Sequence, residues 1–412
     1  MLGRCAPKAN APKASWPGKF RSTKRVKADI LVIGGGLVGS SIALYLRRDP
    51  RAGQVVVIEP DPTYALASTP RASGGFRRLF SSPENIRMSQ YSIDFFNDFE
   101  REVGIDGVAP GLQIKRQGYL FIAEPEFLPV LEENYRTQSA LGVNVQLLDR
   151  DALKRKFPSL ETGDIGAAAY SADDGWLDPN SLLQGVKKKA AALGAQYIQD
   201  RVVGIYAAAN LVRGVDLESG ARIDADVLVN AAGAWASQIS DMAGMCLPVF
   251  PMRRFDHYFE CNVAVEPLPY VKDMARLAMR PEGRGFTAGV PNWNEPRGFN
   301  FDVDHGYFEN VVWPAIAHRV PSFEAVKLKS SWSGLYDQNA LDTNMILGPW
   351  VNGLSNFYVA AGFSGHGLMH APAVGRALAE LIYDGRYQTL DLSAMSYRRI
   401  IDQIPYPERG II

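Results

Sequence analysis

The hydrophobic pattern near the start of the chain predicts a strand, a helix and a second strand in succession. An apolar run from Ile30 to Ile33 precedes a glycine-rich turn and a helical stretch that extends to about Arg48. The segment QVVVIEPD then supplies a second apolar strand that ends at Glu59. Continuous apolar strands joined by an amphipathic helix are typical of a βαβ unit in a parallel sheet.

The turn between the first strand and the helix has the spacing G-x-G-x-x-G, with glycines at 34, 36 and 39. In this context Gly34 makes the tight turn, Gly36 lets the backbone approach a pyrophosphate, and Gly39 lets the helix pack on the strand. Glu59 lies 20 residues beyond Gly39, where it can accept hydrogen bonds from ribose hydroxyls. The fingerprint predicts a dinucleotide site and disfavours NADP, but does not by itself distinguish FAD from NAD.

A second glycine cluster, GRGFTAG at 283–289, has no apolar strand before it, and we interpret it as a turn. The chain is therefore expected to have one dinucleotide site. A flavin in that site would take its electrons directly from the substrate, because no second site for a nicotinamide donor is predicted.

Helix signals and apolar runs alternate through the middle of the chain. Ser82 is the candidate N-cap of a helix whose buried face extends to Val103, and Asp178 is the candidate N-cap of a helix that Gly194 ends. A short apolar run at 227–229 predicts a buried strand of the parallel type. Residues 246–330 instead hold many aromatics and prolines between alternating strands, which indicates an antiparallel sheet.

Composition excludes several classes of function. The 412 residues include 44 basic and 44 acidic side chains, and this balance argues against nucleic acid or an anionic membrane as the main partner. No apolar run approaches the ~20 residues that a transmembrane helix needs. The three cysteines lack a C-x-x-C spacing, and we expect all three to be thiols in a reducing compartment.

Residues 1–27 carry eight basic side chains and no acidic one. Such a segment could be a mitochondrial presequence, although Pro7, Pro12 and Pro17 would interrupt the helix that the signal requires. We therefore expect a basic, disordered tail on a cytoplasmic protein of bacterial type, with the mitochondrial matrix as the alternative.

Four segments together resemble the D-amino-acid oxidase/sarcosine oxidase family of FAD enzymes: DILVIGGGLVGSS…VVVIEPD, DGWLDPNSLL, VLVNAAGAWA and AAGFSGHGLMHAPAVGRALAELI. The resemblance runs from about Ala28 to Leu392. Shorter segments, among them SSPENIRMS and GRYQTLDLS, carry a narrower likeness to one group of relatives. The resemblance implies an α/β fold (α+β overall), with a doubly wound Rossmann-type FAD domain and an interleaved antiparallel-sheet substrate domain.

The two domains are expected to interleave along the chain. The FAD domain is predicted over residues 28–108, 161–245 and 325–395. The substrate domain is predicted over residues 109–160 and 246–324, and residues 396–412 are predicted to form a C-terminal tail.

The resemblance also implies which residues meet the cofactor. In the family, the loop matching 362–369 passes the flavin ring, and the next helix points its N-terminus at the pyrimidine edge, where N–H donors stabilise the reduced anion. The implied cofactor-binding residues are Gly34, Gly36, Leu37, Val38, Gly39, Glu59, Ser68, Ser73, Gly74, Gly75, Val202, Ala232, Gly233, Trp235, Gly334, Gly365, His366, Gly367, Leu368 and Met369. The catalytic candidates are Arg77, His366 and Tyr336.

No metal site is expected. His366 and His370 lie four residues apart at the start of a predicted helix, as metal ligands sometimes do. Gly367 stands where a zinc protease has its glutamate, and no third ligand accompanies the pair.

Two positions depart from the family pattern. Sarcosine oxidases bond FAD to a cysteine where this chain has Gly334, so we expect FAD to be non-covalent. Those enzymes also use a lysine at the position of Met369 to hold the substrate carboxylate, and methionine cannot pair with a carboxylate. A small α-amino acid therefore fits only if an arginine takes over that role, and the candidate arginines are Arg253, Arg254, Arg276 and Arg280. Otherwise the substrate is larger or less acidic.

The expected function is oxidation of a C–N bond in an amine or amino-acid-like substrate by hydride transfer to flavin, with water hydrolysing the imine. The electron acceptor stays open between oxygen, a quinone and an electron-transfer flavoprotein. The alternative is an assembly factor or chaperone for a respiratory complex, in which FAD has a structural role and little turnover occurs. An NAD dehydrogenase is disfavoured because the C-terminal glycine loop would then have no partner.

Overall fold

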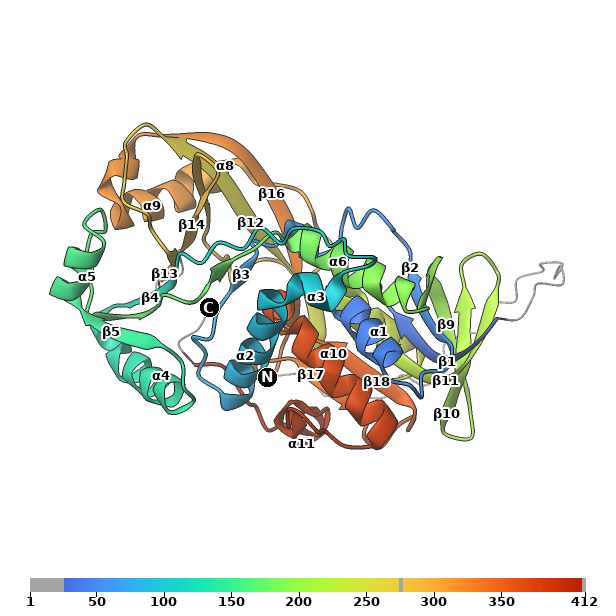
Figure 1. Cartoon of the computed structure of the whole chain (residues 1–412). Helices are drawn as coiled ribbons and strands as arrows, with labels where there is room; N and C mark the ends of the chain where they lie inside the picture. Colours follow the sequence, from blue (N-terminus) through green and yellow to red (C-terminus); the bar gives the residue numbers. More distant parts are fainter. Residues whose placement is uncertain (1–25, 274–276, 410–412) are drawn as a thin grey trace.

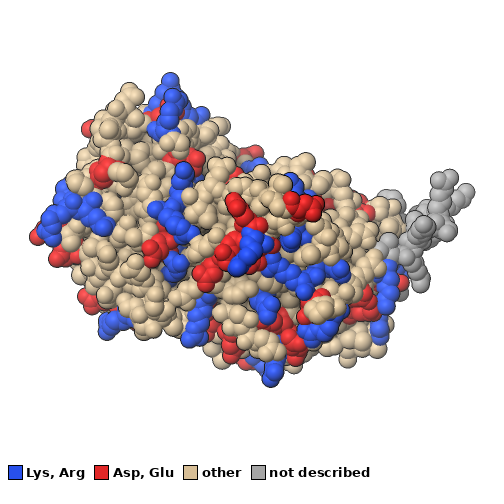
Figure 2. All heavy atoms as spheres, in the orientation of Figure 1, with Lys and Arg blue, Asp and Glu red and all other residues tan. Residues whose placement is uncertain are grey.

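The computed structural model of the protein describes residues 26–273 and 277–409 (Figure 1). Its strands form two large sheets that lie at opposite ends of the view in Figure 1, with the helices α2, α3 and α10 between them. Figure 2 shows acidic and basic side chains mixed over the visible face, as the zero net charge leads one to expect.

The first sheet has a parallel centre that is buried on both faces. Ile30 and Val32 pack into one core cluster, whereas Leu31 and Ile33 pack into another on the opposite face, which explains the continuous apolar run in the sequence. Along the sheet the order is β17-β18-β11-β1-β2-β8. The parallel strands are β18 (Phe357–Ala361), β11 (Arg222–Asn230), β1 (Val26–Ile33), β2 (Val55–Glu59) and β8 (Gln196–Gln199).

Three further strands extend this sheet in the antiparallel sense, and helices cover it. The strands are β17 (Ile346–Pro349), β9 (Val202–Ala208) and β10 (Leu211–Leu217). The helices are α1 (Leu37–Arg48), α2 (Pro83–Asn97), α3 (Phe99–Val103), α6 (Pro179–Ala192), α7 (Ala236–Met242), α10 (Gly367–Asp384) and α11 (Arg398–Asp402).

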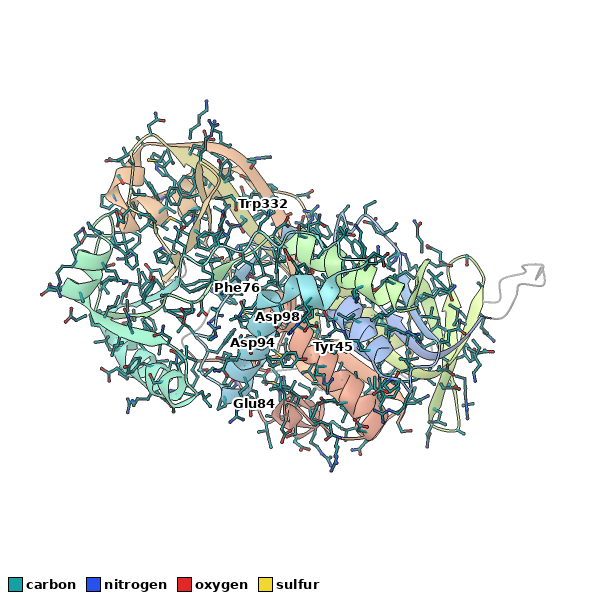
Figure 3. All side chains as sticks on the ribbon, in the orientation of Figure 1. Tyr45, Phe76, Glu84, Asp94, Asp98 and Trp332 are labelled. Carbon is teal, nitrogen blue, oxygen red and sulfur yellow. The ribbon has the colours of Figure 1, made fainter. Side chains whose placement is uncertain are left out.

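Helices α1 and α10 pack directly against each other (Figure 1). A Cβ atom at Gly375 of α10 would lie 2.6 Å from the carbonyl oxygen of Ser41 in α1, so this crossing requires a glycine. Tyr45, labelled on α1 in Figure 3, packs beside Phe95 of α2 with ring centroids 6.5 Å apart. The three helices thus share one core over the first sheet.

The second sheet has the order β16-β12-β15-β14-β13-β4-β6-β5. Its strands are β4 (Tyr119–Ala123), β5 (Val145–Asp149), β6 (Ala167–Ser171), β12 (Val249–Cys261), β13 (Tyr270–Asp273), β14 (Ala278–Glu282), β15 (Gly285–Gly289) and β16 (Val326–Asn339). Helices α4 (Leu128–Ala140), α5 (Arg150–Lys156), α8 (His305–Tyr307) and α9 (Trp313–Arg319) accompany it. A short pair, β3 (Gly75–Phe76) and β7 (Gly175–Trp176), stands apart from both sheets.

The second sheet is antiparallel, as predicted, except where β13 pairs with β4 in parallel. These two strands come from distant parts of the chain, so no hairpin fixes their relative direction. The glycine cluster at 283–289 forms the turn and the second strand of the β14–β15 hairpin, and Gly283 has φ +54° in the turn. It therefore contains a strand as well as the predicted turn.

The predicted βαβ unit and the helix that starts at Pro179 are present, but the helix after Ser82 differs from the prediction. It breaks at Asp98 into α2 and α3. Ser82 occupies the N-cap position without capping the helix, because its hydroxyl donates to the carboxylate of Glu408 instead. A partner more than 300 residues away in the chain is not visible in the local sequence pattern.

The predicted domain division stays a prediction, although two strands pair across its boundaries. β6 and β16 were assigned with the first domain, but both pair within the second sheet. The segment predicted as a C-terminal tail holds α11 and the buried Glu408. Of the basic N-terminal segment, residues 1–25 lie outside the described residues, while Val26 and Lys27 begin β1.

Two further expectations concern chemistry and membranes. Cys261 is a free thiol and Cys246 is disulfide-bonded, which corrects the expectation of thiols throughout; Cys5 lies outside the described residues. Within residues 26–273 and 277–409, no helix has the length and apolar character needed to cross a membrane.

Helix α6 provides a direct test of the local signals. The Asp178 carboxylate accepts hydrogen bonds from the backbone N–H groups of Asn180 and Ser181, at 2.8 and 3.3 Å. We expect Asp178→Ala to lower the free energy of unfolding by about 1 kcal/mol, because two N–H groups lose their acceptor. Asp178→Asn keeps an acceptor and should retain most of the stability in thermal melts. Equal losses in both variants would contradict a capping role.

Candidate functional site

A cavity of about 710 Å³ lies between the two sheets. On one side it is lined by residues at the carboxyl ends of the parallel strands, including Gly34 after β1, Glu59 at the end of β2 and Ala231 after β11. On the other side it is lined by one face of the second sheet, including Arg254 and Lys272. Ligand sites in open α/β sheets occur at this end of the strands.

Backbone crowding shapes the first turn of the cavity. Gly34 has φ +99°, and a Cβ atom there would lie 2.5 Å from the carbonyl oxygen of Ala231. A Cβ at Gly39 would lie 1.9 Å from the carbonyl oxygen of Gly34. Gly36 has nothing within 4 Å of its Cβ position and opens onto the cavity. These neighbours fit the three roles that the glycine spacing predicts.

The N-terminus of α1 faces the cavity beside Glu59. Gly36 is the N-cap residue, no side chain caps the helix, and Leu37 and Val38 line the cavity. The Glu59 carboxylate accepts from the Gly35 N–H at 2.8 Å and from the Asp61 N–H at 2.9 Å. Burial raises the pKa of Glu59, with the two N–H groups opposing that shift. Free N–H groups and a nearby acceptor suit a phosphate and a ribose, respectively.

The segment 67–77 passes between the sheets and is fixed to the second one. The Ser68 hydroxyl donates to the Leu335 carbonyl at 2.6 Å, and the Ser73 hydroxyl lies 2.8 Å from that of Tyr270. A Cβ atom at Gly75 would lie 2.7 Å from the Tyr270 ring. Small residues therefore let this segment lie close against the sheet while still lining the cavity.

Arg77 follows this segment and is buried, with no carboxylate partner in the part of the chain that the structure describes. It is 1% exposed, and it donates to the Leu79 carbonyl at 2.6 Å and contacts His366 Nε2 at 3.2 Å. The guanidinium also lies 4.0 Å from the centroid of the Phe80 ring. Because arginine can only donate, Nε2 of His366 accepts and Nδ1 carries the proton. Burial, followed by the Arg77 charge, holds the pKa of His366 well below its usual value, so the imidazole is neutral.

The C-terminal glycine loop is held by a carboxylate from β16. Asp337 accepts from the N–H groups of Gly362 at 2.8 Å and Phe363 at 3.1 Å. Helix α10 begins directly after this loop, with no capping side chain, and its residues Gly367, Leu368 and Met369 line the cavity. A second free helix N-terminus therefore faces the same cavity as that of α1.

Gly365 in this loop has a closer neighbour than the sequence indicates. It has φ +96°, and a Cβ atom there would lie 2.4 Å from the ring of Tyr336. The glycine is therefore required by the backbone conformation and by an aromatic side chain of β16, independently of any ligand. Tyr336 lines the cavity, and burial raises its pKa.

The four arginines considered for a substrate carboxylate differ in their partners. Arg253 pairs with Glu295 at 2.5 Å, and Arg280 pairs with Glu282 and donates to the Ser73 carbonyl. Arg276 lies outside the described residues. Arg254 lines the cavity; its Nη2 is buried and has no hydrogen-bond partner among the described residues. Its guanidinium lies 4.6 Å from the Trp293 ring and 5.1 Å from the Tyr336 ring.

Among the charged cavity residues that the sequence analysis did not predict, two lie on the second sheet close to Arg254. Asp256 and Lys272 both line it; the Asp256 carboxylate accepts from the backbone N–H of His257, and Lys272 makes no side-chain hydrogen bond or ion pair among the described residues. Burial raises the pKa of Asp256 to about 6 and lowers that of Lys272 to about 7. Side chains alternate between the two faces of a strand, so Asp256 lies on the same face of β12 as Arg254. Once Arg254 was a candidate ligand-binding residue, this alternation could have indicated Asp256 as a second one.

Twenty-one of the 22 residues predicted for the site line this one cavity; the exception is Gly39, which packs beneath the turn. His370 does not line it; its Nε2 lies 3.1 Å from the Ser89 hydroxyl, which indicates a structural position. Within the described ranges, no group of three metal-ligating side chains occurs. The ligand roles of the individual residues stay predictions.

Comparison with known proteins decides the family. The model of the DAO family, described as FAD dependent oxidoreductase, matches residues 29–381. The chain belongs to the DAO family of FAD-dependent oxidoreductases. The resemblance stated from sequence is thereby confirmed, and the protein is an enzyme of the oxidoreductase class.

DAO-family relatives cover nearly the whole chain. FAD-dependent oxidoreductase domain-containing protein 1 of Xenopus laevis is 39% identical over 94% of this chain and 85% of its own length. Mouse mitochondrial sarcosine dehydrogenase is 28% identical over 90% of this chain, which corresponds to 41% of that enzyme. The structure of L-proline dehydrogenase from P. horikoshii matches with a TM-score of 0.81 and 28% identity, over 92% of this chain and 99% of that one.

The DAO-family cofactor fits the observed cavity. FAD needs an anion site for its pyrophosphate, an acceptor for its ribose and a flat region for its ring. The α1 N-terminus, Glu59 and the glycine-rich loop before α10 offer these three features in one continuous space. The buried Nη2 of Arg254 and the free amine of Lys272 lie on the opposite wall and remain available to a substrate.

Glu59 can be tested by flavin titration. We expect Glu59→Ala to weaken FAD binding by roughly 10- to 150-fold, since charge-assisted hydrogen bonds contribute about 1.5–3 kcal/mol each. Glu59→Gln, which keeps one acceptor, should lose less. The measurement is the dissociation constant of FAD from apoprotein, with circular dichroism to verify folding. An unchanged constant in Glu59→Ala would remove Glu59 from the cofactor site.

Proposed function

We propose that this enzyme oxidises the C–N bond of an amine that also carries a carboxylate, that is, an amino-acid-like substrate. The observation that carries the proposal is the buried Nη2 of Arg254, which has no hydrogen-bond partner among the described residues and lies in the same cavity as the two uncapped helix N-termini. The names of two relatives at 28% identity, sarcosine dehydrogenase and L-proline dehydrogenase, support a small amino acid.

Arg254 would hold the substrate carboxylate. An arginine stays charged when buried, and its planar fork matches a carboxylate in two hydrogen bonds. Its Nη1 makes only long bonds to the carbonyl oxygens of Arg253 and Asn292, at 3.4 and 3.3 Å. Arg254 would thus take the role of the lysine that Met369 cannot fill, which supports an α-amino acid as the substrate.

The chain's other residues would orient the substrate and control its proton. Asp256 lies two residues from Arg254 on the same face, where its carboxylate can accept a hydrogen bond from the substrate nitrogen. Because the Asp256 pKa is about 6, this group is largely ionised at neutral pH and can also hold a proton that the amine releases. Tyr336 and Trp293 flank Arg254 and limit the access of water to the ion pair.

FAD, when bound, supplies the hydride acceptor for the carbon next to nitrogen. The α10 N-terminus and the neutral His366 line the part of the cavity beside the glycine loop, where N–H donors favour negative charge. No cysteine lines the cavity among the described residues, and Gly334 occupies the position implied for attachment. These features support a non-covalent cofactor.

Non-covalent binding is tested by acid precipitation. We expect the purified protein to be yellow and to release all of its flavin into the supernatant, because no thiol of residues 26–273 or 277–409 lines the cavity. The measurement is flavin absorbance in the supernatant and in the redissolved pellet. Flavin that stays with the pellet after denaturing washes would show a covalent link.

The reaction is tested by anaerobic reduction of the flavin. Sarcosine, proline and related amino acids should bleach the absorbance near 450 nm. We expect Arg254→Met to lower the apparent substrate affinity by about 10- to 100-fold, because the carboxylate loses its charged partner. Arg254→Lys should recover part of that loss. Arg284→Met, at a side chain that is 89% exposed, is the matched control.

The same assay separates this function from the alternative. If no amine or amino acid reduces the flavin at any concentration, the proposed reaction is wrong, and a structural role for FAD in an assembly factor becomes the better account. The electron acceptor and the compartment remain predictions: oxygen, a quinone or an electron-transfer flavoprotein, in a bacterial-type cytoplasm or a mitochondrial matrix.

A further inference from the structure

The second sheet presents an ordered row of charge to the cavity. In the strand register, Asp256 of β12 lies opposite Gly289 of β15, Gly289 opposite Ala278 of β14, and Ala278 opposite Lys272 of β13. Directly paired residues point to the same face of a sheet. Asp256 and Lys272 therefore stand at the two ends of a row whose middle holds only small residues.

Arg254 lies beside this row, along β12 and at right angles to it. It is two residues from Asp256 on the same face, opposite Gly334 of β16. Asp256 thus stands at a corner between two cations, with Arg254 along its own strand and Lys272 across the sheet. The space around them is open because Gly334, Gly289 and Ala278, which also line the cavity, have little or no side chain.

Arg254 and Lys272 each keep a nitrogen without a hydrogen-bond partner among the described residues, whereas the third cation nearby does not. The terminal nitrogens of Arg77 are already engaged by Leu79 and His366. Lys272 makes no hydrogen bond or ion pair within the described ranges, not even with Asp256 across the two small residues. A half-buried ammonium without a partner is unfavourable, so a bound anion would stabilise its charged form.

We propose that the substrate has two carboxylates, one on each side of the amine nitrogen: Arg254 binds the first, Lys272 binds the second, and Asp256 accepts a hydrogen bond from the nitrogen. This inference rests on the proposed C–N oxidation for its chemistry and on the charge order of the sheet for its specificity. The substrate class is an N-(carboxyalkyl) amino acid or a closely related amino dicarboxylate.

The spacing of the row favours such a compound over a simple amino acid. Lys272 lies three strands from Asp256, about 14 Å between backbones at ~4.8 Å per strand. The flexible four-carbon stem of lysine shortens this gap but leaves its ammonium apart from the Arg254 guanidinium. A monocarboxylate held by Arg254 would leave Lys272 unpaired, and burial together with Arg77 already lowers the pKa of Lys272 to about 7.

The test is ligand binding to the purified holoenzyme, followed by perturbation of the flavin absorbance. The probes are non-reactive acids in matched pairs: succinate against propionate, and glutarate against butyrate. We expect the better dicarboxylate to bind about 10- to 100-fold more tightly than its partner, the range for one added charged hydrogen bond. In Lys272→Met and Lys272→Gln this ratio should fall to about one, whereas Lys188→Met, at an exposed lysine, should keep it.

The outcomes are distinct. A ratio near one in the unaltered enzyme for both pairs would overturn the two-carboxylate inference, as would a ratio that survives both Lys272 variants with full flavin content.

Anaerobic reduction by sarcosine and by N-(carboxymethyl)glycine separates this result from the proposed reaction. If sarcosine reduces the flavin and the dicarboxylates show no advantage, C–N oxidation stands and the second-carboxylate site is wrong. If dicarboxylates bind selectively but no amine reduces the flavin, the binding site stands and the proposed reaction is wrong.

Discussion

The site depends on backbone atoms that approach more closely than any side chain would allow. At the first turn, Gly34 lies against Ala231 and Gly39 lies against Gly34, at distances where a Cβ atom would collide. This crowding brings α1 onto β1 with its first N–H groups directed to the end of the sheet. Everything else in the cavity is arranged around that uncapped helix end, which offers a partial positive charge without a side chain.

A second set of contacts connects this cofactor region to the opposite wall. Strand β16 contributes Leu335, whose carbonyl accepts from Ser68, and Asp337, whose carboxylate holds the loop before α10. Trp332, labelled on β16 in Figure 3, donates from its indole nitrogen to the Arg71 carbonyl at 3.0 Å. Strand β16 of the second sheet therefore positions two loops that line the cofactor region, the segment 67–77 and the loop before α10. These contacts fix the position of the second sheet relative to the cofactor region.

The features that could be predicted from sequence are those with a local physical signature. The βαβ turn is encoded by three glycines and two apolar runs, and the α6 start by Asp178 before a proline. The resemblance to the family added site residues from segments that are far apart in the sequence and meet in the cavity. Lys272 and Asp256 gave no such signal, because a single charged residue in an alternating strand looks like a solvated position until the sheet order is known. Ser82 likewise looked like a helix cap, and its actual partner comes from the far end of the chain.

The order of the strands along the chain has a consequence for how such enzymes can diverge. The chain builds β1 and β2 in the first sheet and β4 to β6 in the second, then β8 to β11 in the first and β12 to β16 in the second, and it returns to the first sheet with β17 and β18. A recombination event at any single point between β1 and β18 would separate strands that pair with each other. Exchange of whole modules is therefore a poor route to a new substrate, whereas point substitutions on the cavity face of β12, β13 and β14 leave the pairing intact. Lineages with this interleaved architecture should diversify in specificity by changing individual side chains on a conserved scaffold.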